Sequence, residues 1–129
     1  MPDEPTPAVA GIPRLLLRLE GAALLIVAVA MFWHSGASWW LFAILILAPD
    51  LSFVGYLAGP RVGAIAYNAA HTTSTPIALA LIGAGAAAPI VVVIAVIWLA
   101  HIGADRMLGY GLKYGAGFGF THLGRVGRA

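Results

Sequence analysis

The 129-residue chain contains no cysteine, which excludes disulfide bridges, thiolate metal ligands and cysteine nucleophiles. Charged residues make up only 9% of the chain, against about 25% in an ordinary soluble domain. Hydrophobic residues make up 61%, and a soluble domain of this size cannot bury that much apolar surface. The composition therefore excludes a soluble enzyme, a nucleic-acid-binding domain and a disordered chain, and it predicts an integral membrane protein.

Four apolar stretches are long enough to cross a membrane. Crossing about 30 Å of hydrocarbon takes about 20 helical residues at 1.5 Å per residue. Because the polar or glycine- and proline-containing turns between the stretches are short, neighbouring spans run antiparallel. The fold we expect is all-α, an up-down bundle of four transmembrane helices that forms one polytopic domain over 14–110. The predicted spans cover about 14–33, 39–57, 61–83 and 90–110.

Two segments flank the predicted bundle. Residues 1–13 contain four prolines and two acids, which is typical of a disordered leader. Residues 111–129 are rich in glycine and predict a tail at the membrane interface, in which His122 is solvated. A cleaved signal peptide is the alternative for the first span. Glu20 inside that span and the three spans that follow it favour a retained helix.

Lysine and arginine fall at one end of the predicted bundle. The two opposite turns contain neither residue, so the positive-inside rule places both termini in the cytoplasm and the spans in the cell (inner) membrane. We expect the basic side chains near the spans, Arg106 among them, to reach outward toward lipid headgroups rather than inward. The basic residues at this end are Arg14, Arg18, Arg61, Arg106, Lys113, Arg125 and Arg128.

The ionisable and amide side chains within the spans share one depth, roughly 7–15 Å from the cytoplasmic face at 1.5 Å per residue. A charged group at bilayer depth costs about 2.5–3.5 kcal/mol, which residues on different helices limit by meeting inside the bundle. His101 and Asp105 lie four residues apart and share a helix face. We therefore predict one polar cavity that opens toward the cytoplasm. Its residues are Glu20, Asp50, Asn68, His71, His101 and Asp105.

The histidines and acids of this cavity suit a divalent metal, because imidazole and carboxylate ligands bind Zn, Mn or Fe. A metal there would activate water against a membrane-borne ester or phosphate, with Glu20 as general base and with Tyr67 and Asn68 orienting the substrate. The partners we expect are the lipid bilayer and a lipid substrate, and no nucleic acid. The predicted metal ligands are His71, His101, Asp105 and Asp50. The predicted catalytic residues are Glu20, Asp50, Tyr67 and Asn68.

Other functions fit the same residues. The histidines and acids could form a structural network that sets helix pairing in an accessory membrane protein. His71 and His101 could also ligate one haem axially. Transport is less favoured because no polar path continues through the other half of the predicted bundle. The sequence contains no pattern that sets an oligomeric state.

Several distinctive stretches are spread over the chain. They are RLEG (18–21), SWWLF (38–42), APDLS (48–52), GYLAGPRVGA (55–64), YNAAHT (67–72), HIGADRMLGYGLKY (101–114) and THLGR (121–125). On these stretches the chain resembles, over about residues 14–128, the domain-of-unknown-function 4260 family of small bacterial membrane proteins. The resemblance implies a protein with several membrane spans and no assigned activity, so it transfers no catalytic residue.

Overall fold

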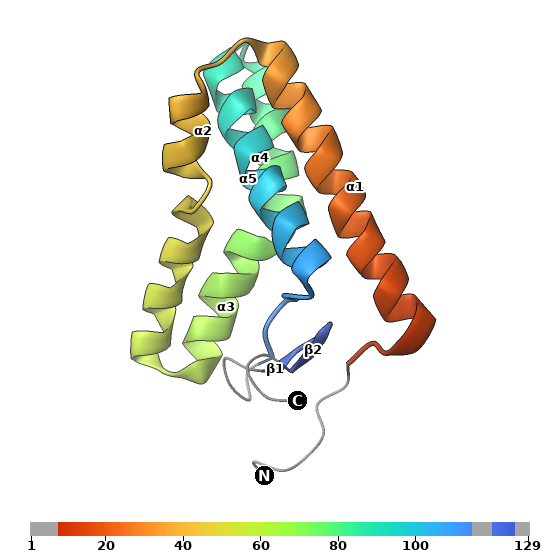
Figure 1. The fold of residues 1–129 in the computed structure, drawn as a ribbon. Coiled ribbons are helices and arrows are strands. Elements are labelled where there is room, and N and C mark those ends of the chain that lie inside the picture. Colours follow the sequence, from red (N-terminus) through yellow and green to blue (C-terminus); the bar gives the residue numbers. More distant parts are fainter. Residues whose placement is uncertain (1–7, 115–119, 126–129) are drawn as a thin grey trace.

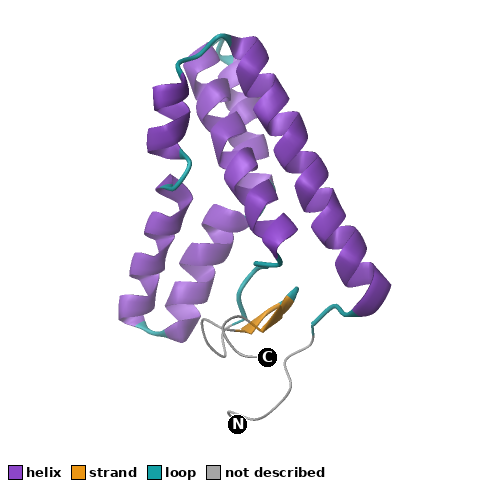
Figure 2. Ribbon diagram, in the orientation of Figure 1, coloured by secondary structure: helices purple, strands orange, loops and turns teal. Residues whose placement is uncertain are grey.

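The computed structural model describes residues 8–114 and 120–125, and these residues form helices followed by one small hairpin (Figures 1 and 2). Three helical stretches are long and apolar enough to cross a membrane, which suggests a membrane location. They cover Gly11–Ser35, Trp39–Ala58 and Pro89–Leu108. The elements are α1 (Gly11–Ser35), α2 (Trp39–Leu45), the 3-10 helix η1 (Ala48–Ala58), α3 (Pro60–His71), α4 (Ser74–Gly85), α5 (Pro89–Leu108), β1 (Phe120–Thr121) and β2 (Gly124–Arg125).

Helix α5 is the centre of the packing, with α1 and α4 against it, whereas η1 packs mainly on α3 (Figure 1). Glycine allows α1 and α5 to approach closely. A Cβ atom on Gly21 would lie 2.5 Å from Cβ of Arg106, and one on Gly103 would lie 2.6 Å from the backbone nitrogen of Leu25. Small residues at such crossings let helix backbones pack in lipid without a hydrophobic driving force. The buried core beside this crossing consists of Ala28, Phe32, Val93, Val96, Ile97 and Ala100.

Two of the four predicted spans are interrupted. The second stops at Leu45 and resumes at Ala48, where Pro49 cannot donate a helical hydrogen bond. The third, expected to be continuous over 61–83, is split into α3 and α4, and Pro76 in the first turn of α4 explains the split in the same way. The second and third predicted spans are therefore each broken, although α3 and α4 together still run from one end of the molecule to the other (Figure 1).

Both ends of the described chain lie at one end of the molecule, together with the connection between η1 and α3 (Figure 1). The tail is anchored there, since Lys113 pairs with Thr121 in an isolated β-bridge and Thr121 and Leu123 are fully buried. The backbone N–H of Val9 donates to the carbonyl of His122. Helix α1 begins at Gly11, before the predicted boundary. Residues 8–10 of the predicted disordered leader precede this helix, and residues 1–7 lie outside the described residues.

Candidate metal centre

Four side chains from three elements converge at the level of the two helix interruptions. Asp50 comes from η1, His71 is the last residue of α3, and His101 and Asp105 lie one turn apart on α5. Each offers one ligand-type atom, and these atoms lie within 4.8 Å of one another. The four ligands that were predicted from their common depth thus lie together in the structure.

The two Nε2 atoms are at the middle of this group. They lie 3.1 Å apart. Nε2 of His71 is 3.2 Å from Oδ1 of Asp50 and 3.4 Å from Oδ2 of Asp105. Nε2 of His101 is 3.1 Å and 3.2 Å from the same two oxygens. For metal–ligand distances of about 2.0–2.1 Å, a tetrahedron has edges of about 3.3–3.4 Å. Five of the six distances among the four ligand atoms are therefore close to the edges of a tetrahedron around a divalent ion.

The hydrogen atoms of the imidazoles are committed elsewhere. Nδ1–H of His71 donates to the carbonyl of Tyr67 at 2.9 Å, and Nδ1–H of His101 donates to the carbonyl of Ile46. A carbonyl only accepts, so each Nδ1 must carry the hydrogen, and each neutral ring presents a bare lone pair on Nε2. Metal-bound histidines commonly have this arrangement, in which the second ring nitrogen is fixed by a backbone carbonyl.

Protons on the Nε2 atoms cannot satisfy all the short contacts in this group. One proton on either Nε2 can point at one acceptor and leaves the other short contacts unsatisfied. Two such protons would face each other across the 3.1 Å that separates His71 from His101. Two carboxylates and two imidazole lone pairs converging on one point instead match the ligand set of a divalent cation. The same distance disfavours the haem alternative, because axial nitrogens lie on opposite sides of an iron, about 4 Å apart for bonds of about 2.0 Å.

The interruption of the third span leaves the end of α3 without helical partners for its last carbonyls. The turn itself covers two of them. The N–H of Thr72 donates to the carbonyl of Asn68 at 2.8 Å, and the hydroxyl of Thr75 donates to that of Ala69 at 2.6 Å.

Helix α5 covers the other two. The indole N–H of Trp98 donates to the carbonyl of Ala70, and Nη2 of Arg106 donates to the carbonyl of His71 at 3.3 Å. His101 likewise covers the carbonyl of Ile46 at the interruption between α2 and η1. The breaks that bring Asp50 and His71 to the site are thus held by the helix that carries the other two ligands.

One side of the group is closed by stacked rings. The ring of Tyr67 lies 3.7 Å from that of His71 at an interplanar angle of 8°, and Phe53 stacks on Tyr67 at 5.4 Å. Nζ of Lys113 lies 4.9 Å from the centre of the Tyr67 ring. Burial lowers the pKa of the Lys113 ammonium, while the charge of Asp105 acts in the opposite sense. The wall therefore fixes the His71 ring and adds a buried cation near the acids.

Comparison with known proteins places the chain in a family. A family model described as Domain of unknown function (DUF4260) matches residues 14–126. The chain belongs to this family. No curated protein and no solved structure matches it. The resemblance seen in the sequence is confirmed, and the role of the centre in this DUF4260 chain has to be argued from its own geometry.

Two residues predicted to join the site lie elsewhere. Glu20 is exposed on α1, so its expected burial beside the other acids is wrong, and it lies outside the converging group. Both side-chain amide atoms of Asn68 are used by the tail of this DUF4260 chain. Nδ2 donates to the carbonyl of Lys113 at 2.8 Å, and Oδ1 accepts from its N–H at 2.6 Å. Asn68 therefore holds the tail backbone through one N–H and one lone pair of its amide.

Arg106 and His122 also differ from expectation. Arg106 is partly buried against the carbonyl of His71 instead of extending to the headgroups. His122 is partly buried, and its Nδ1 accepts from the N–H of Leu112 at 2.9 Å. Burial, and then the nearby Arg106 guanidinium, lower the pKa of His122. The glycine-rich tail carried no periodicity from which this docking could have been predicted.

Access to the centre is through its acids. The side chains of His71 and His101 are 3% and 5% exposed, whereas those of Asp50 and Asp105 are 34% and 21% exposed. The imidazoles are thus the fixed, dry side of the group, and the carboxylates are the side that a solute can approach.

Proposed function

We propose that this protein is a membrane metalloprotein that holds one divalent ion between Asp50, His71, His101 and Asp105. The observation that carries the proposal is the convergence of two bare Nε2 atoms and two carboxylate oxygens at 3.1–3.4 Å, with both Nδ1–H groups engaged elsewhere. Zn, Mn and Fe are the ions that this nitrogen and oxygen set suits. A divalent ion would also neutralise the two carboxylates, which removes much of the cost of placing them in a membrane.

Metal analysis of purified protein tests this proposal. The wild-type chain, expressed with Zn, Mn and Fe in the medium, should retain about one divalent ion per chain. Stripping it with a chelator should lower the melting temperature, and adding one of these ions back should restore it. A chain without metal, whose melting is unchanged by chelator and by added ions, would refute the proposal. That result would favour the helix-pairing network instead.

The reaction that this centre supports best is hydrolysis of a membrane-borne ester or phosphate. A divalent ion would supply Lewis acidity to a carbonyl or phosphoryl oxygen. The more exposed carboxylate, Asp50, is placed to accept a proton from an attacking water and return it to the leaving oxygen. In ester hydrolysis water adds to the acyl carbon, the carbon–oxygen bond breaks, and an acid and an alcohol leave.

Reconstituted protein tests the reaction. Phospholipid vesicles containing the metal-loaded chain should release fatty acid or a phosphorylated headgroup, measured by mass spectrometry, and Asp50→Asn should abolish the release. The matched control is Glu20→Gln, which changes an exposed carboxylate outside the centre and should leave the rate unchanged. Equal release by the metal-loaded wild type and by Asp50→Asn would refute this assignment.

We also propose that both termini face the cytoplasm across the inner membrane. The support is the placement of the described basic residues near the spans at the end where the termini lie (Figure 1). Because the chain has no cysteine, a single Ser38→Cys variant in the opposite turn is a clean probe. An impermeant maleimide added to intact cells should label it, and absence of labelling until the cells are lysed would reverse the orientation.

A further inference from the structure

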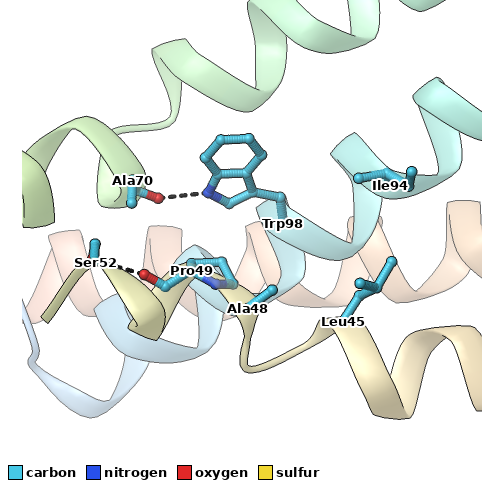
Figure 3. Close-up of a pocket in the computed structure, with 7 residues that line it drawn as sticks. All are labelled: Leu45, Ala48, Pro49, Ser52, Ala70, Ile94 and Trp98. Carbon is cyan, nitrogen blue, oxygen red and sulfur yellow. Dashed lines mark hydrogen bonds between the residues drawn. The ribbon is translucent and has the colours of Figure 1, made fainter. Parts of the chain in front are cut away.

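An apolar groove of about 330 Å³ lies between α2, η1, α3 and α5, three of which carry the proposed metal ligands (Figure 3). This volume is within the range of small-molecule sites, roughly 300–1,000 Å³. The apolar residues that line it are Leu45, Ala48, Pro49, Ala70, Ile94 and Trp98.

The groove and the centre are built from the same short segments. Pro49 directly precedes Asp50, Ala70 directly precedes His71, and Trp98 lies one helical turn before His101. Consecutive Cα atoms are about 3.8 Å apart, so the lining of the groove begins within one residue of two of the ligands. The segments that line the groove therefore continue directly into the segments that carry the ligands, although no ligand itself lines the groove.

The polar groups of the groove are already satisfied. The indole N–H of Trp98 donates to the carbonyl of Ala70, and the hydroxyl of Ser52 donates to the carbonyl of Pro49 at 2.7 Å (Figure 3). A polar ligand would find no free donor in these two side chains and would lose its own hydration on entry. The lining therefore selects a hydrocarbon occupant.

A lipid bilayer around the protein would supply a hydrocarbon occupant for the groove. The same helical stretch, which is apolar enough to span a membrane, leaves Ile44, Leu47 and Leu51 exposed. In a bilayer these side chains face acyl chains, and an acyl chain can enter a partly open groove from the side without crossing water.

We propose that the groove binds one acyl chain of a membrane lipid and presents its ester group to the metal centre. This inference rests on the proposed function, and it narrows the substrate from any membrane-borne ester or phosphate to the carboxylic ester of an acyl lipid. The groove fixes the chain, and the centre receives the carbonyl at its head. The remainder of the lipid stays at the end where the acids are accessible.

Photo-crosslinking tests the groove directly. Purified full-length protein is placed in phosphatidylcholine vesicles that contain a trace of diacyl phospholipid with a diazirine in one acyl chain. Labelled peptides should be enriched at the groove, around Leu45 and Ile94, over other exposed apolar faces such as those of Ile65 and Leu81. Equal labelling of all exposed faces would overturn the proposal, and this comparison needs no variant.

Variants give an independent test. Ile94→Trp fills the groove from α5 and should remove the groove labelling. Its matched control, Ile90→Trp, introduces the same side chain at an exposed position of that helix and should retain it. Groove labelling that persists in a folded Ile94→Trp chain, judged by its melting transition, would contradict the assignment.

Two further comparisons separate the possible failures. Diazirine-bearing free palmitate in place of the phospholipid distinguishes a free fatty acid from an ester, and labelling by palmitate alone would overturn the ester. Metal content is measured on the same samples. Groove labelling in a chain that binds no metal removes the proposed metal function and supports the groove alone, whereas bound metal without groove labelling refutes only the groove.

Discussion

Asp105→Asn separates a metal centre from a hydrogen-bonded network. The substitution keeps the shape of the side chain and removes one anionic ligand. Apparent binding free energies of four-ligand zinc sites are about 10–16 kcal/mol, or roughly 3 kcal/mol per ligand. Losing one ligand should therefore weaken metal binding about 100-fold.

The effect on stability follows by linkage. An ion present at 100 times its dissociation constant stabilises the wild type by about 2.7 kcal/mol. After a roughly 100-fold loss of affinity the same ion stabilises the variant by only about 0.4 kcal/mol. The expected difference in metal-dependent stability is thus about 2.3 kcal/mol.

The metal-free proteins should behave in the opposite sense. Oδ2 of Asp105 is 3.4 Å and 3.2 Å from two Nε2 atoms that carry lone pairs, so an asparagine N–H there gains acceptors where the carboxylate was repelled. We expect the metal-free variant to be at least as stable as the metal-free wild type. Chemical denaturation in detergent, with and without added Zn, measures both differences. Equal destabilisation by Asp105→Asn with and without metal would refute the reasoning and indicate a salt-bridged network.

Three further predictions concern the helix crossing and the tail. Gly21→Ala should destabilise the fold by about 1–3 kcal/mol, because the new methyl group overlaps backbone and Cβ atoms of α5. The control Gly85→Ala meets nothing within 4 Å and should leave the stability unchanged, which melting curves of the two variants would show. Asn68→Ala removes two hydrogen bonds to the tail backbone, which together contribute about 1–3 kcal/mol. The substitution should speed hydrogen exchange in the tail without changing metal content, and unchanged exchange would contradict the anchoring role. Since the folded-state pKa of His122 is lowered below about 6.5, tail docking should be complete above that pH and weaken as the pH falls toward the lowered value. Protection of the Leu112 amide, corrected for intrinsic exchange, should report this loss, and His122→Asn, which keeps an acceptor that does not titrate, should make it independent of pH.

Counting residues along the spans predicted the depth of the polar side chains in the bundle well. It predicted poorly on which side of its helix each of them lies. Asp50, His71, His101 and Asp105 came from three expected spans at one depth, and they do converge. Glu20 shares the depth but not the direction. The buried stripe of α1 runs through Gly21, Ala28 and Phe32, and a residue next to Gly21 is turned about 100° away from it. Which stripe of an apolar helix faces its neighbours depends on packing, and an almost uniformly apolar helix carries little periodicity to reveal it.

Residue counting could not predict the end of α3 or the docking of the tail, for other reasons. Pro49 explains the break between α2 and η1, but the end of α3 at His71 depends on acceptors that α5 satisfies through Trp98 and Arg106. The docking of the tail depends on Asn68 reaching a backbone 45 residues away. Contacts at such separations have no local pattern, so the anchoring of the tail could not be predicted from the sequence.

The split third span has a consequence for biosynthesis. Two of the carbonyls that it frees accept from side chains of α5, which follows it in the chain and is therefore synthesised later. A nascent chain that ends before Pro89 would expose those groups to hydrocarbon, at several kcal/mol each. The segment that carries His71 cannot therefore settle as an independent unit, and its final placement in the bilayer waits for the arrival of its C-terminal neighbour. Truncated chains should accordingly be recognised and degraded as incompletely inserted proteins.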